Sequence, residues 1–505
     1  MKKKFFFASL LIGACLAFAT PSMAQDKMVK LTTAKEIGQP INFFVNHNSK
    51  GVTIDWGDGQ PQTYTTKKAD GICHIEGSVK GKVISISGNA NWTMLSCQNC
   101  GLTSIDLSQA QGLVSLYCPN NQLTSINLKG MTKLADLDCS NNKISRVLFT
   151  QFNHPEKDLE SIENINFSNN NFSGKYKYDF STIKNLNISN NRYTSIVLDS
   201  PNLKSLDCSN NNIVGTINLN TCTQLENLVV SNNNISSLVL AEEGKNLKQL
   251  FCDNNNLYKL QLTNAADLMD LDCQNNNITQ VNVNEKTSVE ILNVSNNAMG
   301  FSALPPKHLA PKYISFEPQA VINVSHVPGM MHKDNVPYAP IAQNWSENKT
   351  VCIDLSQFCN LANGRSDVNA HWFSVNPDGS ETEMVPRTSS SGKGDVYNGR
   401  GYFAFYTPQK KVYGKFTSKS YGFTITCTPF AVGDDITAVD RVIADENGLT
   451  ISVVQGNIQL NSATATAVNI CTIEGKPAWQ QVVSGQTTVS LPKGVYIVNG
   501  KKIIL

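Results

Sequence analysis

Long hydrophobic runs, histidine and an excess of charge of either sign are scarce in this chain of 505 residues, of which 16% are charged and seven are histidine. After residue 24 no run approaches about 18 apolar residues, so the sequence predicts no transmembrane helix. Lys and Arg total 42, and Asp and Glu total 40. Residues 1–24 hold three lysines and no acid, so the rest of the chain has 39 basic and 40 acidic residues, a net charge of −1. A near-neutral chain without a basic stripe gives no electrostatic reason to expect binding to nucleic acid or to an anionic membrane.

Motifs for catalysis and metal binding are also missing from the sequence. H-E-x-x-H, G-x-S-x-G and phosphate-loop sequences do not occur, and no two histidines have metal-ligand spacing. Asp55 and Asp58 could suggest calcium, but two carboxylates in a turn favour capping of that turn. We therefore expect no catalytic residue, no metal site, no cofactor and no enzymatic activity.

The first 24 residues are typical of an export signal. Lys2 to Lys4 form a positive start, Phe5 to Ala19 an apolar stretch, and Ser22 to Ala24 a small-x-small cleavage site. Ile12 to Cys15 look like a lipoprotein box, but the apolar residues after Cys15 favour ordinary cleavage after Ala24. We expect an exported protein at the cell surface, in the outer membrane or outside the cell, rather than in the periplasm.

An internal repeat dominates the chain from Trp92 to about Met299. Residues 113–123 match L-x-x-L-x-L-x-x-N-x-L, and the match recurs in ten copies, most of them 20–22 residues apart. The sixth positions of the copies are Cys97, Cys118, Cys139, Phe167, Ile188, Cys208, Val230, Cys252, Cys273 and Val294. This is the leucine-rich repeat signature, and the copies resemble the short repeats of bacterial exported proteins, including the internalin-like group, over about 200 of 505 residues.

The physical chemistry of the pattern predicts the same solenoid. Positions four and six lie on one side of a short strand, and their apolar residues can be buried only by stacking copies into a continuous core. The ninth position is Asn in every copy but the first, which has Cys100, and stacked buried Asn can satisfy the backbone of the bend. Asn at every eighth position suits a left-handed backbone. The ten remaining residues per copy predict an extended or 3₁₀ return. The seven extra residues near 149–159 predict a bulge on the convex or lateral side, such as a helical turn.

The thirteen cysteines outside the leader are an odd number for a disulfide framework. In-register side chains in a parallel stack lie about 4.8 Å apart, whereas a disulfide needs Cβ atoms about 3.8 Å apart, so we predict buried free thiols. Cys97 and Cys100 form a C-x-x-C sequence, but both occupy repeat positions, which favours a structural role over redox or zinc chemistry.

The flanking segments predict a mainly β chain. Residues 25–90 are interpreted as an N-terminal β cap, and the repeats are expected to span 91–302. The cap contains a Trp56-Gly57-Asp58-Gly59 turn that looks like that of PKD-type domains. Prolines from Pro305 onward are expected to stop the repeat. Residues 303–435 look like an immunoglobulin-like β-sandwich with Trp372 in its core, and Cys352 has either Cys427 or Cys359 as a disulfide partner. Residues 436–505 form a second β-sandwich that resembles the type IX secretion sorting domain of Bacteroidota-like bacteria.

The outward positions of the repeat strands predict a binding face on the concave side of the solenoid. The expected partner is a protein, bound as an adhesin would bind it, because this face is polar and mildly acidic with apolar residues that could be anchors. A solvated face with incidental apolar residues is the alternative. The predicted binding residues are Tyr117, Asp136, Asp138, Asp207, Val229, Phe251, Asp270 and Asp272. A second hypothesis is glycan binding by the sandwich, with Trp345, Trp372 and Tyr402 stacking on sugars.

Overall fold

The structure of the chain is a computed structural model that describes residues 27–46, 51–65, 71–88, 92–150, 155–178, 180–284, 287, 289–309, 312–333, 336–341, 352–361, 367–387, 393–433, 443–444, 449–454, 457–472, 476–492, 495–499 and 501–504. The predicted leader with Cys15, and Trp345 of the glycan hypothesis, lie outside the described residues. The chain divides into a first unit, Met1–Asn297 with Pro305–Glu317, and a second unit, Ala298–Leu304 with Pro318–Leu505. Among the described residues, no helix has both the length and the apolar character needed to cross a membrane.

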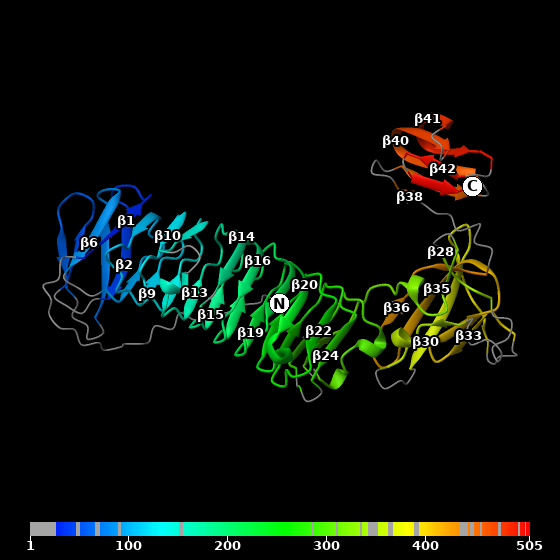
Figure 1. The fold of residues 1–505 in the computed structure, drawn as a ribbon, viewed down its shortest axis with the longest axis horizontal. Coiled ribbons are helices and arrows are strands. Elements are labelled where there is room, and N and C mark those ends of the chain that lie inside the picture. Colours follow the sequence, from blue (N-terminus) through cyan, green and yellow to red (C-terminus); the bar gives the residue numbers. More distant parts are fainter. Residues whose placement is uncertain are drawn as a thin grey trace. The chain divides into compact units, whose positions relative to one another are not determined.

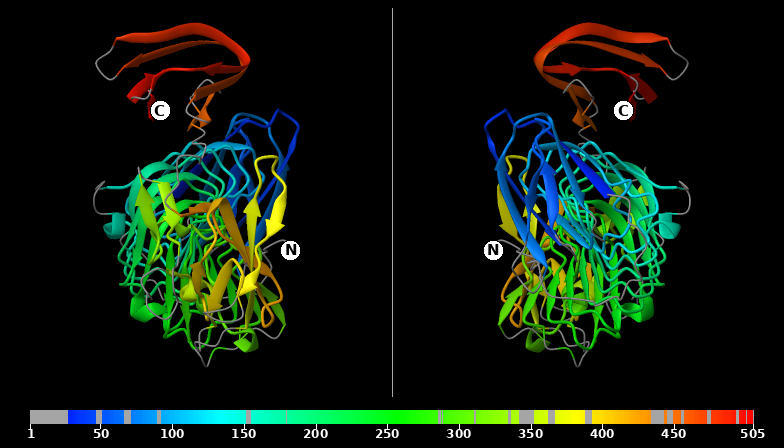
Figure 2. Two further views of the ribbon diagram at one scale, coloured as in Figure 1. Left: turned by 90° about the vertical axis from the view of Figure 1, so that its right-hand side faces the viewer. Right: turned by 90° about the vertical axis from the view of Figure 1, so that its left-hand side faces the viewer.

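The first unit is a leucine-rich repeat β-solenoid, as predicted. Figure 1 shows its strands stacked in chain order, and Figure 2, which looks along the stack, shows successive copies overlying one another. Eleven parallel strands join in register into one long sheet: β7 (Met94–Ser96), β9 (Ser115–Tyr117), β11 (Asp136–Asp138), β13 (Asn164–Asn166), β15 (Asn185–Asn187), β17 (Ser205–Asp207), β19 (Asn227–Val229), β21 (Gln249–Phe251), β23 (Asp270–Asp272), β25 (Ile291–Asn293) and β26 (Tyr313–Ser315). The middle residue of each repeat strand from β7 to β25 is buried, which is the inward face that the fourth repeat position predicts.

The return side of each copy is extended, as the short copy length predicts. Its strands are β8 (Leu102–Asp106), β10 (Ser125–Asn127), β12 (Arg146–Leu148), β14 (Ser173–Tyr178), β16 (Arg192–Leu198), β18 (Val214–Leu219), β20 (Asn234–Leu240), β22 (Lys259–Leu262) and β24 (Gln280–Val283). The 3₁₀ turns of the first unit are η1 (Pro155–Lys157), η2 (Ala241–Gly244) and η4 (Lys307–Leu309). Turn η1 lies in the long copy, which confirms the predicted helical turn, and the buried Asp158 beside it accepts hydrogen bonds from the backbone of Gly130 (2.7 Å) and Thr150 (2.5 Å).

A ladder of buried asparagines at the ninth repeat position holds consecutive copies together. Asn211 is representative: its amide nitrogen donates to the carbonyls of Ile188 in the preceding copy (3.1 Å) and of Cys208 in its own (3.1 Å). Its side-chain oxygen accepts from the backbone N–H of Tyr193 in the preceding copy (3.0 Å). Each such Asn therefore satisfies buried backbone groups on both sides of a copy boundary.

The exception in the first copy has a physical reason. Cys100 stands where the other copies have Asn, and the copy before it is replaced by the antiparallel strand β2 (Pro40–Asn46). No preceding bend has to be bridged there, and the Cys100 thiol donates instead to the carbonyl of Asn42, 3.0 Å away. The eighth-position asparagines are all left-handed, with φ between 52° and 57°, as predicted; they are Asn99, Asn120, Asn141, Asn169, Asn190, Asn210, Asn232, Asn254, Asn275 and Asn296.

The described residues between 27 and 88 extend both sides of the solenoid. Strands β2 and β5 (Ile72–Ser78) continue the long sheet, and β1 (Lys27–Thr33), β6 (Val83–Gly88), β3 (Val52–Asp55) and β4 (Gln62–Tyr64) continue the return side from β8. The carboxylate of Asp55 accepts from the backbone of Gly57 (2.8 Å) and Gly59 (3.0 Å). Asp58 accepts from the backbone N–H of Gln60 (3.1 Å) and pairs with Lys80 at 2.8 Å. These contacts confirm the turn-capping interpretation of the two carboxylates.

The repeat continues past the prolines that were expected to end it. Strand β26 pairs in register with β25, and the backbone N–H of Val294 donates to the carbonyl of Ser315 (2.9 Å), the same bond that links earlier copies. The prediction that the repeat stops at Pro305 was therefore wrong. A proline excludes helix and central-strand positions, but here the prolines lie in the connection between two strands.

The described part of residues 318–433 in the second unit forms two sheets around an aromatic core. The larger contains β27 (Met331–Lys333), β28 (Val336–Ala339), β37 (Phe430–Val432), β35 (Gln409–Ser418), β30 (Val368–Val375), β31 (Glu381–Glu383) and β36 (Thr424–Thr426); the smaller contains β29 (Ile353–Asp354), β34 (Tyr402–Phe405), β33 (Val396–Gly399) and β32 (Pro386–Arg387). The short helices of this unit are α1 (Ser356–Cys359), η3 (Phe301–Ala303) and η5 (Val324–His326). Trp372 is buried between the sheets, with the rings of Phe403, Phe405, Phe416 and Phe430 centred 4.9–5.7 Å away.

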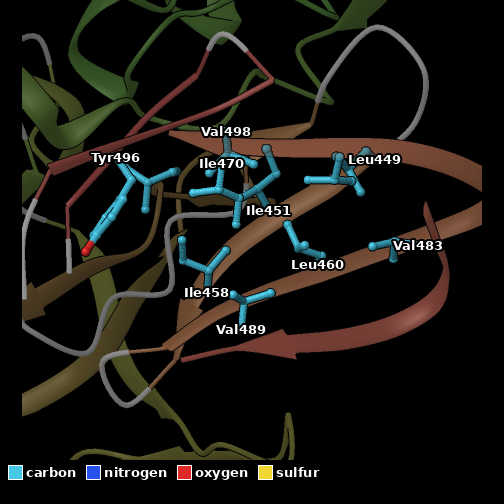
Figure 3. Packing of buried hydrophobic residues seen from close by; sticks show 11 residues of the cluster. Leu449, Ile451, Ile458, Leu460, Ile470, Val483, Val489, Tyr496 and Val498 are labelled. Carbon is cyan, nitrogen blue, oxygen red and sulfur yellow. The ribbon is translucent and has the colours of Figure 1, made fainter. Parts of the chain in front are cut away.

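The last sheet of the second unit consists of β38 (Ile443–Ala444), β39 (Thr450–Val454), β40 (Asn457–Thr472), β42 (Val495–Val498) and β43 (Lys501–Ile504), with β41 (Pro477–Val489) paired to β40. Figure 3 shows its core, in which Ile451, Leu460 and Val483 are among the buried side chains. Alternating burial along β40 places its apolar residues on one face, as the alternating sequence requires.

Candidate binding face of the long sheet

The candidate site is the outward face of the long sheet, which carries all eight predicted binding residues. We call this surface the long-sheet face and define it by the third, fifth and seventh positions of each copy, for example Ser115, Tyr117 and Pro119 in the second. In-register pairing aligns these positions in columns that run from strand to strand. Side chains that are 20 or more residues apart in sequence thereby become direct neighbours.

Polar residues of the fifth column are largely occupied by the bend that follows each strand. The carboxylate of Asp138 accepts from the backbone N–H of Ser140 (2.8 Å), and Asp207 accepts from both the N–H (3.0 Å) and the hydroxyl (2.7 Å) of Ser209. Asp272 makes a corresponding, longer bond with the N–H of Gln274 (3.3 Å). These side chains cap turns, so their presence on the face has a structural explanation.

Third-column residues form hydrogen bonds across strands. Asp136 accepts from the hydroxyl of Ser115 (3.1 Å) and the amide of Asn164 (2.6 Å), and Asp270 accepts from the amide of Gln249 (2.7 Å). The donors are neutral groups, so these bonds leave the negative charge of Asp136 and Asp270 uncompensated. These cross-strand hydrogen bonds hold the third-column side chains in one arrangement.

Burial sorts the predicted residues into two groups. Tyr117, Phe251 and most of the aspartates are partly exposed, whereas Val229 (6% exposed) and Asp272 (7%) are buried. Val229 lies between Asp207 and Phe251 of the adjacent strands, and a short side chain between longer neighbours is covered by them. The prediction that Val229 and Asp272 present their side chains to a partner was therefore wrong.

Burial is the main influence on the pKa values of Asp207 and Tyr117. Burial raises the pKa of the Asp207 carboxyl, and its hydrogen bonds to serine partly offset that rise. Burial, with a further contribution from Asp136, raises the pKa of the Tyr117 phenol. Tyr117 therefore remains an uncharged ring with a hydroxyl donor at neutral pH.

The sequence analysis did not identify two aromatic residues of this face, Phe44 and Tyr313. Phe44 of β2 pairs with Ser96, which places its side chain beside the fifth column, where it stacks on His74 with ring centroids 4.4 Å apart. Tyr313 of β26, 43% exposed, extends the third column past Ile291. No repeat signal marks Phe44, because it belongs to the N-terminal cap. Tyr313 was missed because the repeat was predicted to stop at Pro305.

The cysteines of the array are buried free thiols, as predicted. The sulfurs of Cys118 and Cys139 in adjacent copies are 3.1 Å apart, and burial raises the pKa of Cys208 and Cys273. Cys97 and Cys100 are both buried in the repeat core, which agrees with the structural interpretation of their C-x-x-C spacing. A buried, protonated thiol behaves as a small apolar side chain rather than a nucleophile.

The glycan hypothesis loses one of its aromatic platforms. Trp372 is only 2% exposed and enclosed by phenylalanines, so it confirms the core interpretation and cannot stack on a sugar. Tyr402 is 43% exposed. Cys352, Cys359 and Cys427 are all free thiols, so neither disulfide that the sequence suggested is present. Burial raises the pKa of the Cys359 thiol, with a smaller contribution from Cys427.

Comparisons with known proteins give neither a family model nor a curated protein that matches the chain. Among solved structures, YopM, a leucine-rich effector protein from Yersinia pestis, aligns with 22% identity and a TM-score of 0.38 over 47% of this chain and 63% of that protein, less than two thirds of its length. The functional domain of InlJ from Listeria monocytogenes, which includes a cysteine ladder, aligns with 16% identity and a TM-score of 0.27 over 70% of this chain and 93% of that one. YopM from Yersinia enterocolitica aligns with 18% identity and a TM-score of 0.26 over 46% and 70% of the two chains. The fold assignment rests on the copies and hydrogen bonds of this chain itself.

Proposed function

We propose that this protein is an exported, surface-displayed, non-enzymatic binding protein whose long-sheet face meets a protein partner. The observation that carries the proposal is a continuous, pre-ordered face of eleven strands on which aromatic rings stand among hydrogen-bonded polar side chains. Rings held on a rigid face lose little conformational entropy on binding, and such residues are frequent binding anchors. Among the described residues, no group of His, Cys, Asp and Glu is arranged to hold a metal ion.

The test of the face is a double substitution of its anchors. Tyr117→Ala with Phe251→Ala should abolish capture of the partner from intact neighbouring cells, measured with the purified full chain by crosslinking and mass spectrometry. Tyr258→Ala is the matched control, because Tyr258 is 58% exposed but lies on the return side, outside the long-sheet face. Capture that survives the double substitution, or that Tyr258→Ala abolishes equally, would overturn the proposed face.

The proposed export has a separate test. Protease treatment of intact source cells, followed by mass spectrometry of the released termini, should release a chain that begins at Gln25 and lacks the residues after about 435. Such termini would follow from cleavage after Ala24 and from removal of a tail that resembles a sorting domain. Protection of the protein in intact cells, with Leu505 retained, would contradict surface display.

A further inference from the structure

One position on the long-sheet face has an aromatic ring on either side of a small residue. Ser96 of β7 pairs in register with Phe44 of β2 on one side and with Tyr117 of β9 on the other. In-register partners point to the same face of a sheet, so the two rings flank Ser96 on the long-sheet face. We call these three residues the two-ring site; it lies at the end of the array where β2 and β9 are labelled in Figure 1.

The ring of Phe44 turns one of its faces toward Ser96. Phe44 stacks on His74 of β5 with ring centroids 4.4 Å apart and ring planes 8° apart. Strand β2 lies between β5 and β7 in the sheet, and the stacking distance is close to the spacing of adjacent strands, roughly 4.8 Å. The two rings are therefore stacked along the direction from strand to strand, so the second face of Phe44 is directed toward β7 and Ser96.

The position between the two rings is open. Ser96 is partly exposed, whereas Val229, which also lies between two longer residues of the same column, is only 6% exposed. Phe44 and Tyr117 therefore do not close over Ser96. The strands that carry the rings are two spacings apart, roughly 9–10 Å, and a planar group in contact with both rings needs about 7–8 Å. The two-ring site thus has room for one planar group.

Acidic side chains lie beyond both rings of the two-ring site. Asp138 pairs with Tyr117, and Asp136 lies two residues earlier on the same strand. Both carboxylates add to the effect of burial in raising the pKa of the Tyr117 phenol, so their field reaches that ring. On the other flank the side chain of Glu76 is 72% exposed and lies 3.5 Å from the imidazole of His74. Strands β5, β2, β7, β9 and β11 contain no Lys or Arg, so a planar cation is complementary to this end of the face.

We propose that the two-ring site binds the guanidinium group of an arginine of the partner protein, stacked between Phe44 and Tyr117 above Ser96. This inference rests on the proposed function and specifies the side chain that the partner presents. The guanidinium group is both planar and permanently charged, so it can contact two rings and also be attracted to the acids on either flank. Lysine lacks the planar shape and an aromatic ring lacks the charge, so each matches only half of the site.

The experiment measures saturation-transfer difference NMR of small probes with the full chain at neutral pH. The probes are the N-acetyl amides of arginine, of citrulline, which is planar but uncharged, and of lysine, which is charged but not planar. The arginine probe should give the strongest signal, with the citrulline and lysine probes about fivefold weaker. Raising NaCl from about 0.05 M to about 0.5 M should reduce the arginine signal and leave the citrulline signal unchanged. Signals of equal strength from arginine and citrulline, or from arginine and lysine, would overturn the inference.

Substitutions at the two-ring site test whether the arginine probe lies between the rings. Ser96→Leu fills the position and should abolish the arginine signal. Ser96→Ala is the matched control, because it leaves the position open and should bind the probe as the unaltered chain does. Phe44→Leu and Tyr117→Leu keep an apolar side chain but remove a ring, and each should weaken the arginine signal about fivefold. A signal that survives Ser96→Leu, or that the leucine and alanine variants reduce equally, would overturn the assignment of the site.

Failure of this inference is distinguishable from failure of the proposed function. If Ser96→Leu still captures the cellular partner while Tyr117→Ala with Phe251→Ala does not, the face binds a partner but not through an arginine at the two-ring site. If neither variant changes capture, the long-sheet face itself is not the binding surface, and the proposed function fails whatever the probes show.

Discussion

The repeat array and the described part of residues 318–433 bury their cores in opposite ways. In the array each copy contacts the next, and the same bonds recur, such as those of Asn211 to Ile188 and Tyr193. In the second region one residue, Trp372, joins rings from strands far apart in sequence. The difference teaches that a local defect should spread along the array to its neighbours, whereas the second region should fail as a whole when its centre is removed.

Alkaline pH should produce the largest difference between the two regions. Burial raises the pKa of Cys208 and Cys273 above the ordinary thiol value of about 8.5, so the folded state holds protons that the unfolded state loses. Stability is therefore complete below pH 8.5 and falls above it, by up to about 1.4 kcal/mol per buried thiol and pH unit. The array has more such thiols than the second region, where the pKa values of Cys352 and Cys427 rise to about 11 and about 12.

Pulsed N-ethylmaleimide labelling of the full chain between pH 8 and pH 10.5, read by mass spectrometry, measures this effect. Cys208 should become reactive at a lower pH than Cys427. The variant with Cys118→Ala and Cys139→Ala removes two buried thiols and should raise the pH at which Cys208 reacts. If Cys208 and Cys427 became labelled at the same pH in the unaltered chain and in the variant, the predicted difference between the two regions would be wrong.

Truncation of Trp372 should have the next largest effect, confined to the second region. Trp372→Ala removes the centre of a core of four phenylalanines and should cost about 3–5 kcal/mol. Hydrogen exchange of the full chain should then accelerate throughout β30 and β35, with no change in peptides from the array. Trp372→Phe, which keeps an aromatic ring, should lose less protection.

Loss of one ladder asparagine should be smaller and local to the array. Asn211→Ala leaves the buried N–H of Tyr193 and the carbonyls of Ile188 and Cys208 without their partners, at a cost of about 2–3 kcal/mol. Exchange should accelerate on both sides of β17 and fade within a few copies. Uniform acceleration across the whole array would contradict a nearest-neighbour core.

The smallest effect on stability is expected at Asn210, the eighth-position residue that precedes Asn211. Asn210 is exposed with φ of 53°, so Asn210→Gly should change stability little, whereas Asn210→Ala should cost about 1 kcal/mol because Ala resists this conformation. Urea unfolding monitored by circular dichroism compares the two variants. An alanine variant as stable as the glycine variant would show that the bend, unlike the ladder, tolerates any residue.

The sequence predicted the repetitive features more completely than the non-repetitive ones. The solenoid, the left-handed asparagines and the free thiols all follow from residues that recur at fixed spacing. The strand β26 and the position of Phe44 beside Ser96 do not, because a connection containing prolines and an antiparallel pairing across about 50 residues leave no periodic signal. Burial of Val229 depends on how the side chains on either side of it pack, which the order of residues in the column does not show.

The sequence by itself determined which residues face the core, which bend the backbone and which stand in columns on the long-sheet face, because each of these follows from position within a copy. Only the tertiary structure decided that Val229 is covered, that strand β26 continues the long sheet, and which four phenylalanine rings enclose Trp372. Those properties depend on side-chain packing and hydrogen bonds between neighbours in space, and such contacts exist only once the chain has folded.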